Sequence, residues 1–225
     1  MLRDKKFLYL QGFFVLFVLV CMAFSLLFYG KISLHVEVNV PMSMTWNVFL
    51  ALLAYDFAYF SCQVSKKGAQ IGFAFLWLIF YPNTFYVLTD AKHFVDWLDP
   101  TMVHRLSQFR TLINFNLLIF GIIFGVVLGA WSIQLIVTRF VPYKVLRAFF
   151  VFVISFLSSI GIFVGRSEQL RLNSWDLILH PFNTFFTIIR SINQENLGFF
   201  GAFTVCQIVI ILLLSFSPQL FLQKK

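Results

Sequence analysis

The stretch LINFNLLIFGIIFGVVLGAWSIQLIV, residues 112–137, carries no charged side chain and decides the fold class. A helix of this length, at about 1.5 Å per residue, crosses the roughly 30 Å hydrocarbon core of a bilayer. Similar apolar runs recur along the chain, so we expect one all-α domain over residues 1–225, a polytopic membrane helical bundle of six transmembrane helices. The expected spans are residues 7–29, 45–64, 70–88, 112–137, 145–164 and 197–221.

The composition supports a membrane protein and argues against a nucleic-acid-binding one. The chain is 60% hydrophobic and 12% charged, whereas soluble domains are about 25% charged. The formal net charge is +8, but the sequence has no Lys/Arg run, zinc-ligand spacing or RNA-binding aromatic motif. We therefore expect membrane lipids as partners and no nucleic acid.

The basic residues predict the orientation of the spans, because cytoplasmic loops of membrane proteins are enriched in Lys and Arg. The N-terminus, the second-to-third turn, the fourth-to-fifth turn and the C-terminal tail carry most of them and form one face. We expect this face to be cytoplasmic, with both termini inside. The residues that define it are Arg3, Lys5, Lys6, Lys66, Lys67, Arg139, Lys144, Arg147, Lys224 and Lys225.

Apolar residues in the last outer loop recur at helical spacing and predict a helix that lies flat in the outer interface. They are Phe182, Phe185, Phe186, Ile189 and Ile192, with Asn183, Thr187, Arg190 and Gln194 on the opposite face. An alternative interpretation makes this region a seventh span, so whether residues 174–194 span the membrane or lie in the interface stays open.

Two polar segments, residues 81–93 and 165–176, interrupt the apolar sequence, and the expected topology places both on the outer face. The first contains Pro82-Asn83 near the outer third of the third span, where proline removes a backbone hydrogen bond. Asn83 either repairs the broken backbone or faces a ligand site. Further along, Asp90 and His93 are three residues apart and could act as an acid/base pair or as metal ligands.

The second polar segment contains Asn173-Ser174-Trp175-Asp176, which resembles a capping box followed by an interfacial anchor. Asn173 and Trp175 are candidate ligand-binding residues, and Asp176 is a further candidate for catalysis or metal binding. Arg166 and Arg171, earlier in the same segment, suit a phosphate or carboxylate ligand. Pairing with acidic side chains or lipid phosphates is the alternative.

Within the spans, Asn47 and Asp56 are the polar residues of interest. An intramembrane acid is expected to face the bundle interior and to have a partner. Gly121, Gly125 and Gly129 recur at every fourth position and predict close approach of another helix, in this chain or in a homo-oligomer or membrane-protein partner.

Several blocks together resemble an uncharacterised bacterial membrane family, domain of unknown function 1361, over roughly residues 40–215. The resemblance implies a bacterial multi-pass membrane protein, hence a plasma membrane location, and it implies no activity, cofactor or metal. The blocks are WNVFLA (46–51), WLIFYPN (77–83) running on to LTD (88–90) and His93, Gly165-Arg166, and RLNSWD (171–176).

Two hypotheses on function follow. In the first, the outer polar residues bind an anionic envelope lipid or lipid-linked phosphate and could act on it, with Asp90, His93 and Asp176 as acid/base or metal-binding groups. In the second, the protein is a non-catalytic subunit or scaffold of an envelope complex. A transporter ranks third, because Asp56 alone supports it.

Overall fold

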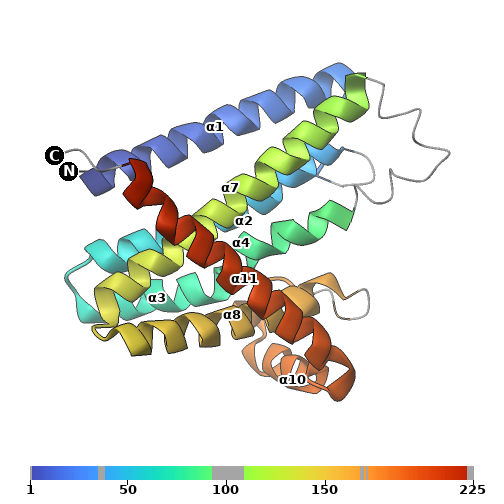
Figure 1. The fold of residues 1–225 in the computed structure, drawn as a ribbon. Coiled ribbons are helices and arrows are strands. Elements are labelled where there is room, and N and C mark those ends of the chain that lie inside the picture. Colours follow the sequence, from blue (N-terminus) through green and yellow to red (C-terminus); the bar gives the residue numbers. More distant parts are fainter. Residues whose placement is uncertain (1, 35–38, 93–108, 168–169, 171, 222–225) are drawn as a thin grey trace. The chain divides into compact units, whose positions relative to one another are not determined.

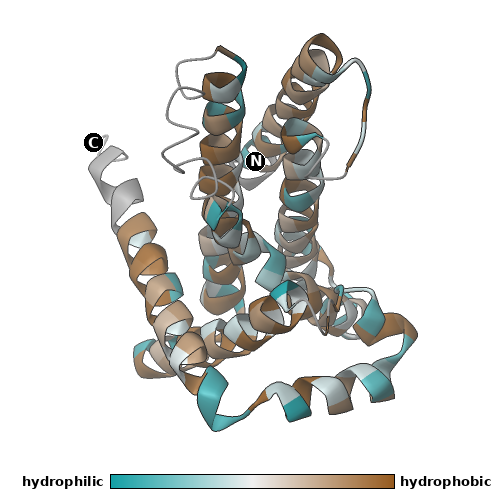
Figure 2. Cartoon of the chain, turned by 90° about the vertical axis from the view of Figure 1, so that its right-hand side faces the viewer, coloured by the Kyte–Doolittle hydropathy of each residue, from teal (hydrophilic) through white to brown (hydrophobic). Residues whose placement is uncertain are grey.

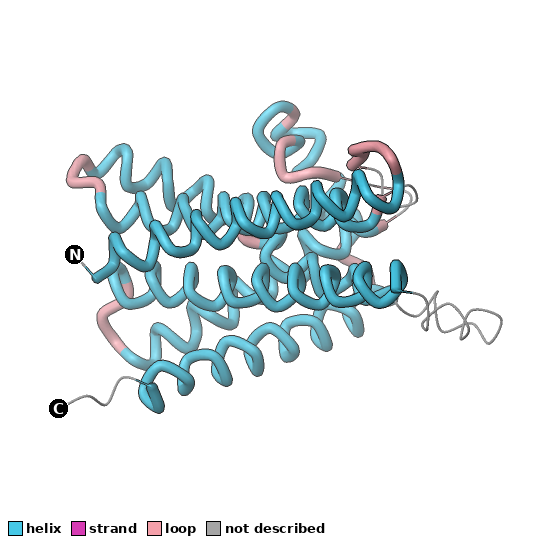
Figure 3. Tube along the Cα trace, turned by 90° about the horizontal axis from the view of Figure 1, so that it is seen from above, coloured by secondary structure: helices cyan, strands magenta, loops and turns pink. Residues whose placement is uncertain are grey.

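The structure, a computed structural model, describes residues 2–34, 39–92, 109–167, 170 and 172–221 (Figure 1). The described chain is helical with short connections and contains no strand among these residues (Figure 3), which confirms the all-α prediction. In chain order the elements are α1 (Leu2–Tyr29), α2 (Val40–Gln63), α3 (Lys67–Phe80), α4 (Pro82–Tyr86), the 3-10 helix η1 (Val87–Ala91), α7 (Phe109–Phe140), α8 (Lys144–Arg166), α9 (Asp176–Leu179), α10 (Pro181–Ser191) and α11 (Gln194–Phe221).

The chain divides into two compact units. Unit 1 comprises Met1–Leu50 and Val87–Gly125, and unit 2 comprises Ala51–Tyr86 and Val126–Lys225. Helices α2 and α7 each contribute residues to both units.

In unit 1, aromatic rings pack α1 against the first part of α7. The ring of Phe17 stacks on that of Phe120 with centroids 5.3 Å apart, and Phe13 stacks on the same ring at 6.2 Å. The start of α2 is capped by Asn39, whose Oδ1 accepts a hydrogen bond from the backbone N–H of Met42 at 3.2 Å. Asparagine is a favoured N-cap residue, so the sequence accounts locally for where this helix begins.

In unit 2, α8 and α11 pack against each other (Figure 1). Ile160, Val164 and Phe200 form a buried apolar cluster between them. Polar side chains also join the pair, since Gln207 Nε2 donates to Ser159 Oγ at 2.9 Å. Such hydrogen bonds between helices contribute to association in membranes, where apolar burial alone gives little preference.

Five helical stretches of the described chain are long and apolar enough to cross a membrane, so the predicted count of six is not confirmed. The second expected span, which corresponds to the 24-residue helix α2, is not among these five stretches. Its polar residues, including Asn47 and Asp56, lower its hydropathy. The five stretches are Lys5–Tyr29, Lys67–Ala91, Phe109–Phe140, Lys144–Arg166 and Gln194–Ser215.

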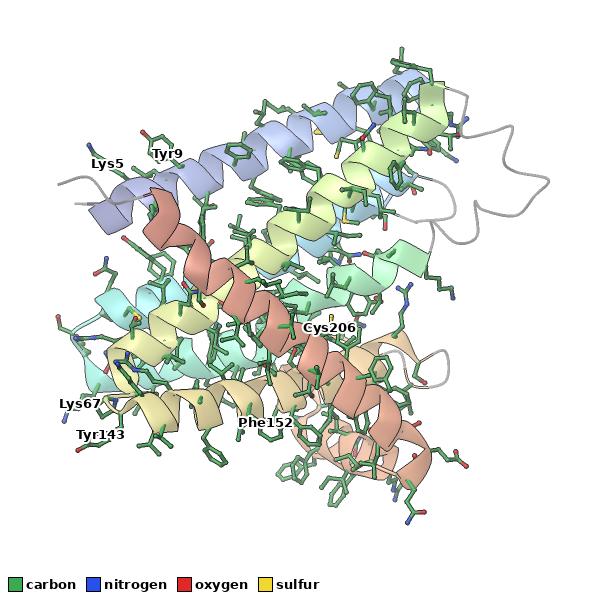
Figure 4. The ribbon with its side chains drawn as sticks, in the orientation of Figure 1. Lys5, Tyr9, Lys67, Tyr143, Phe152 and Cys206 are labelled. Carbon is green, nitrogen blue, oxygen red and sulfur yellow. The ribbon has the colours of Figure 1, made fainter. Side chains whose placement is uncertain are left out.

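The region considered as a seventh span forms short helices instead. The longer one, α10, has 11 residues, which is about half of the length that a membrane-spanning helix needs. In unit 2, Lys67 at the start of α3 and Tyr143 just before α8 lie at the same end (Figure 4), whereas α10 lies at the opposite end (Figure 1). The two basic turns of unit 2 therefore lie at the same end, and the orientation of this end in the membrane stays a prediction.

Candidate functional site

The first polar segment is positioned by a break between α3 and α4. Pro82 begins α4 and has no backbone N–H, so the helical hydrogen bonds of α3 cannot continue through it. The side chain of Asn83 donates from Nδ2 to the carbonyl oxygen of Phe80 at 2.9 Å. Asn83 thus supplies a donor to the carbonyl oxygen of the last residue of α3.

The same amide group of Asn83 also reaches the second polar segment. Its Nδ2 lies 2.8 Å from Ser174 Oγ, although the two residues are 91 positions apart. Next to this bond, the rings of Phe80 and Trp175 meet edge to face with centroids 4.8 Å apart. The two polar segments are thus in contact within unit 2, a fact that their separation in sequence does not reveal.

Arg166, in the last turn of α8, contacts the other end of α4. Its guanidinium donates from Nη1 to Tyr86 Oη at 3.3 Å and lies 5.6 Å from the centre of the same ring. The neighbouring Gly165 lies close to the backbone of the second polar segment, because a Cβ there would be only 3.3 Å from the Leu172 carbonyl oxygen. Helix α4 is therefore where α8 and the second polar segment meet.

Asp176 closes the turn at the start of α9. Its Oδ2 accepts a hydrogen bond from the backbone N–H of Asn173 at 2.6 Å, which is one of the two bonds of a capping box. The N-cap position of α9 is occupied by Trp175 rather than by Asn173, and no side chain caps the helix. Its carbonyl oxygen accepts another from Thr184 Oγ1 of α10 at 3.0 Å. Asp176 thus holds together the segment that contacts α4.

In unit 1, Asp90 forms a different polar contact. It lies in η1, is 3% exposed, and its Oδ2 accepts a hydrogen bond from Asn47 Nδ2 of α2 at 2.7 Å. The sequence singled out both residues but did not pair them. His93, the expected neighbour of Asp90, and Arg171, the expected neighbour of Arg166, lie outside the described residues.

The other intramembrane candidates are also placed. Asp56 is half-buried in the part of α2 that belongs to unit 2. Gly121 lies against Met44 and Val48 of α2, and Gly129 lies against Thr84 and Phe85 of α4. Gly125 is likewise buried. The close approaches at Gly121 and Gly129 are made inside the chain, and a partner chain at this stripe stays a prediction.

Sequence reasoning missed Tyr86 and Ser174 as contact residues, although both stand in the polar segments that it selected. Their roles follow from tertiary contacts, and their own spacing gives no signal of these. Among the residues that the structure describes, no group of three or more His, Cys, Asp or Glu side chains is arranged to hold a metal ion.

The long apolar helices and the absence of strands in the described ranges define a helical, multi-pass membrane protein. Within that class, the chain belongs to the family described as protein of unknown function (DUF1361), whose family model matches residues 46–210. This match confirms the family resemblance and includes both polar segments. A search of curated proteins and a search of solved structures each found no match.

Proposed function

We propose that this protein binds an anionic membrane lipid, or a lipid-linked phosphate, where α8 meets α4. The observation that supports the proposal is the placement of Arg166. Its guanidinium lies beside the hydroxyl and ring of Tyr86, on the same short helix whose Asn83 contacts Ser174. One guanidinium, two hydroxyls and one amide are thereby contributed by three parts of unit 2, namely α8, α4 and the turn before α9.

The chemistry of arginine favours a phosphate ligand. The guanidinium is planar, stays charged at all relevant pH values and can donate two parallel hydrogen bonds to one phosphate or carboxylate. Its position over Tyr86 restrains the plane of the group, which lowers the entropy lost when a ligand binds. In the proposal, Arg171 supplies a second guanidinium from the same segment.

The length of α8 supports a position at headgroup depth for this cluster. The helix has 23 residues, so it extends about 34 Å and its last turn reaches the edge of the hydrocarbon core. Trp175, which is 37% exposed and packs on Phe80, suits the same level, because tryptophan is enriched at membrane interfaces. A lipid phosphate would be available to Arg166 at this depth.

The proposed orientation places the site outside the cytoplasm. The basic turns that precede α3 and α8 are at the other end of unit 2 (Figure 4), and basic loops are normally cytoplasmic. We therefore assign Arg166 to the extracytoplasmic face and both termini to the cytoplasm. The membrane in this proposal is a bacterial plasma membrane.

The proposal is a binding function rather than a reaction. Asp176, a candidate catalytic residue, accepts the Asn173 N–H and so has a role in holding its own segment. Acid/base or metal chemistry by Asp90 and His93 stays a prediction from their spacing.

The test is native mass spectrometry of the purified protein in mild detergent, after expression in membranes that contain phosphatidylglycerol. Wild type is compared with Arg166→Ala, Arg166→Lys and Arg139→Ala. Arg139, in the last turn of α7, is an exposed arginine and serves as the matched control. The mass of the adduct distinguishes an intact lipid from inorganic phosphate.

We expect wild type and Arg139→Ala to retain an anionic lipid that Arg166→Ala loses. Lysine keeps the charge but not the two parallel hydrogen bonds, so Arg166→Lys should retain less lipid than wild type. Equal retention by Arg166→Ala and Arg139→Ala would contradict the proposal. A spectrum dominated by a second protein chain would instead support the subunit hypothesis.

A further inference from the structure

Helix α10 buries polar side chains and exposes large apolar ones, which is the reverse of a helix at a protein–water surface. Its buried side chains are Thr184, which is 4% exposed, and Ser191. A surface helix of a soluble protein buries its apolar side and exposes its polar side. In α10 the exposed side chains include Phe182, which is 80% exposed, Phe185, Phe186 and Ile189.

Hydrogen bonds fix this orientation on the side that faces the rest of unit 2. Thr184 Oγ1 donates to the carbonyl oxygen of Asp176 at 3.0 Å, and Asn196 Nδ2 donates to the carbonyl oxygen of Ser191 at 2.8 Å. On the flank, Ile188 packs against the apolar cluster between α8 and α11. The exposed phenylalanines are therefore held outward by the contacts of their neighbours.

A third side of α10 is polar and exposed. At about 100° per residue, Asn183 and Arg190 lie on nearly the same flank of the helix, beside the aromatic face and away from Ile188. Both are exposed. The helix thus has a side for the protein, a side for an apolar medium and a side for water or charged groups, and a membrane interface provides all three surroundings.

The neighbouring helices indicate which apolar medium covers the aromatic face. Only Ile192 and Asn193 separate α10 from α11, and α8 and α11 are both long and apolar enough to cross a membrane. Figure 2 shows that the coloured part of α11 is mostly hydrophobic beyond its first turn, whereas α10 carries hydrophobic and hydrophilic residues. With 11 residues, α10 is about 16 Å long and is too short to span the bilayer.

We propose that α10 lies in the plane of the bilayer interface, with its phenylalanines among the upper acyl chains and Arg190 at the lipid phosphates. This inference does not rest on the lipid site proposed at Arg166. It has a consequence for that site, because the bond from Thr184 to Asp176 couples the depth of α10 to the depth of the second polar segment.

The experiment uses nitroxide labels on the full chain in vesicles of phosphatidylethanolamine and phosphatidylglycerol. The background carries Cys206→Ala, because Cys206 is the exposed cysteine among the described residues (Figure 4). Labels are placed at Phe186→Cys and, as the matched control on the same helix, Asn183→Cys. Val205→Cys on the exposed side of α11 gives the reference for a lipid-facing position, and Phe182→Cys repeats the test at a second site.

The measured quantity is the accessibility of each label to oxygen, which concentrates in the bilayer, relative to a water-soluble nickel chelate. We expect the ratio at Phe186→Cys and Phe182→Cys to be several-fold higher than at Asn183→Cys and to approach that at Val205→Cys. The same result is expected with Arg166→Ala added. Nickel accessibility equal to that of Asn183→Cys would place the aromatic face in water, and protection from both reagents would show a protein partner on it. Either outcome would overturn the inference.

Discussion

The contact between Asn83 and Ser174 can be tested by a double-mutant cycle with Asn83→Ala and Ser174→Ala. This bond joins the two polar segments, with donor and acceptor 2.8 Å apart. The same Asn83 amide also donates to the Phe80 carbonyl oxygen at 2.9 Å. Asn83→Ala therefore removes two hydrogen bonds, whereas Ser174→Ala removes only the one that is shared.

The expected magnitudes follow from the number of bonds lost. A hydrogen bond in a folded protein contributes about 0.5–1.5 kcal/mol net. We expect Asn83→Ala to lower the free energy of unfolding by about 1–3 kcal/mol and Ser174→Ala to lower it by about 1 kcal/mol. Because both variants lose the same bond, the coupling free energy between the two positions should be about 1 kcal/mol.

The free energies are measured by unfolding in mixed micelles of dodecylmaltoside and SDS, followed by tryptophan fluorescence. Thr138, an exposed α7 residue that donates to a carbonyl of its own helix at 2.7 Å, provides the control cycle with Asn83. That pair should be additive within about 0.5 kcal/mol. Additive effects for Asn83 and Ser174 would refute the hydrogen bond between them.

Two further predictions concern packing and burial. Gly129→Ala should lower the free energy of unfolding by about 1–3 kcal/mol through overpacking, because the new Cβ would lie 2.8 Å from an aromatic carbon of Phe85 in α4. The control Gly201→Ala, which has open space around it, should cause no loss of stability. Equal losses for the two variants in the same micelle assay would contradict the packing of α7 on α4. Asn47→Ala should cost about 1.5–3 kcal/mol by removing a donor from the buried Asp90 carboxyl group. Asn116→Ala, which removes only an exposed bond within its own helix, should cost less than about 0.5 kcal/mol, and a similar loss for both asparagines would argue against the Asn47–Asp90 contact.

The apolar spans could be located from sequence because bilayer thickness sets a length of about 20 apolar residues. The run at residues 112–137 lies inside α7, which extends to Phe109–Phe140. The helix ends lie further out because backbone hydrogen bonding does not stop where the side chains become polar. The predicted count of six spans is not confirmed, because Asn47 and Asp56 make α2 less apolar than the five helical stretches that are apolar enough to cross a membrane.

The candidate site was predictable only where the interactions are local. The bond between Asn173 and Asp176 links residues three apart, so the spacing of a capping box indicates it. The partners of Asn47 and Asn83 depend on which helices pack together, and a single sequence does not determine that. The glycine stripe predicted close helix approach, but its spacing could not show that Gly121 meets α2 and Gly129 meets α4.

The central claim is tested most directly by titrating short-chain phosphatidylglycerol into the purified protein and measuring binding calorimetrically, with phosphatidylcholine as the zwitterionic control. Loss of hydrogen bonds to a charged group costs about 1.5–3 kcal/mol, so Arg166→Ala should weaken phosphatidylglycerol binding by roughly ten- to a hundredfold. Arg139→Ala should bind as wild type does. An Arg166→Ala protein that is folded and binds phosphatidylglycerol with the affinity of wild type would contradict the account.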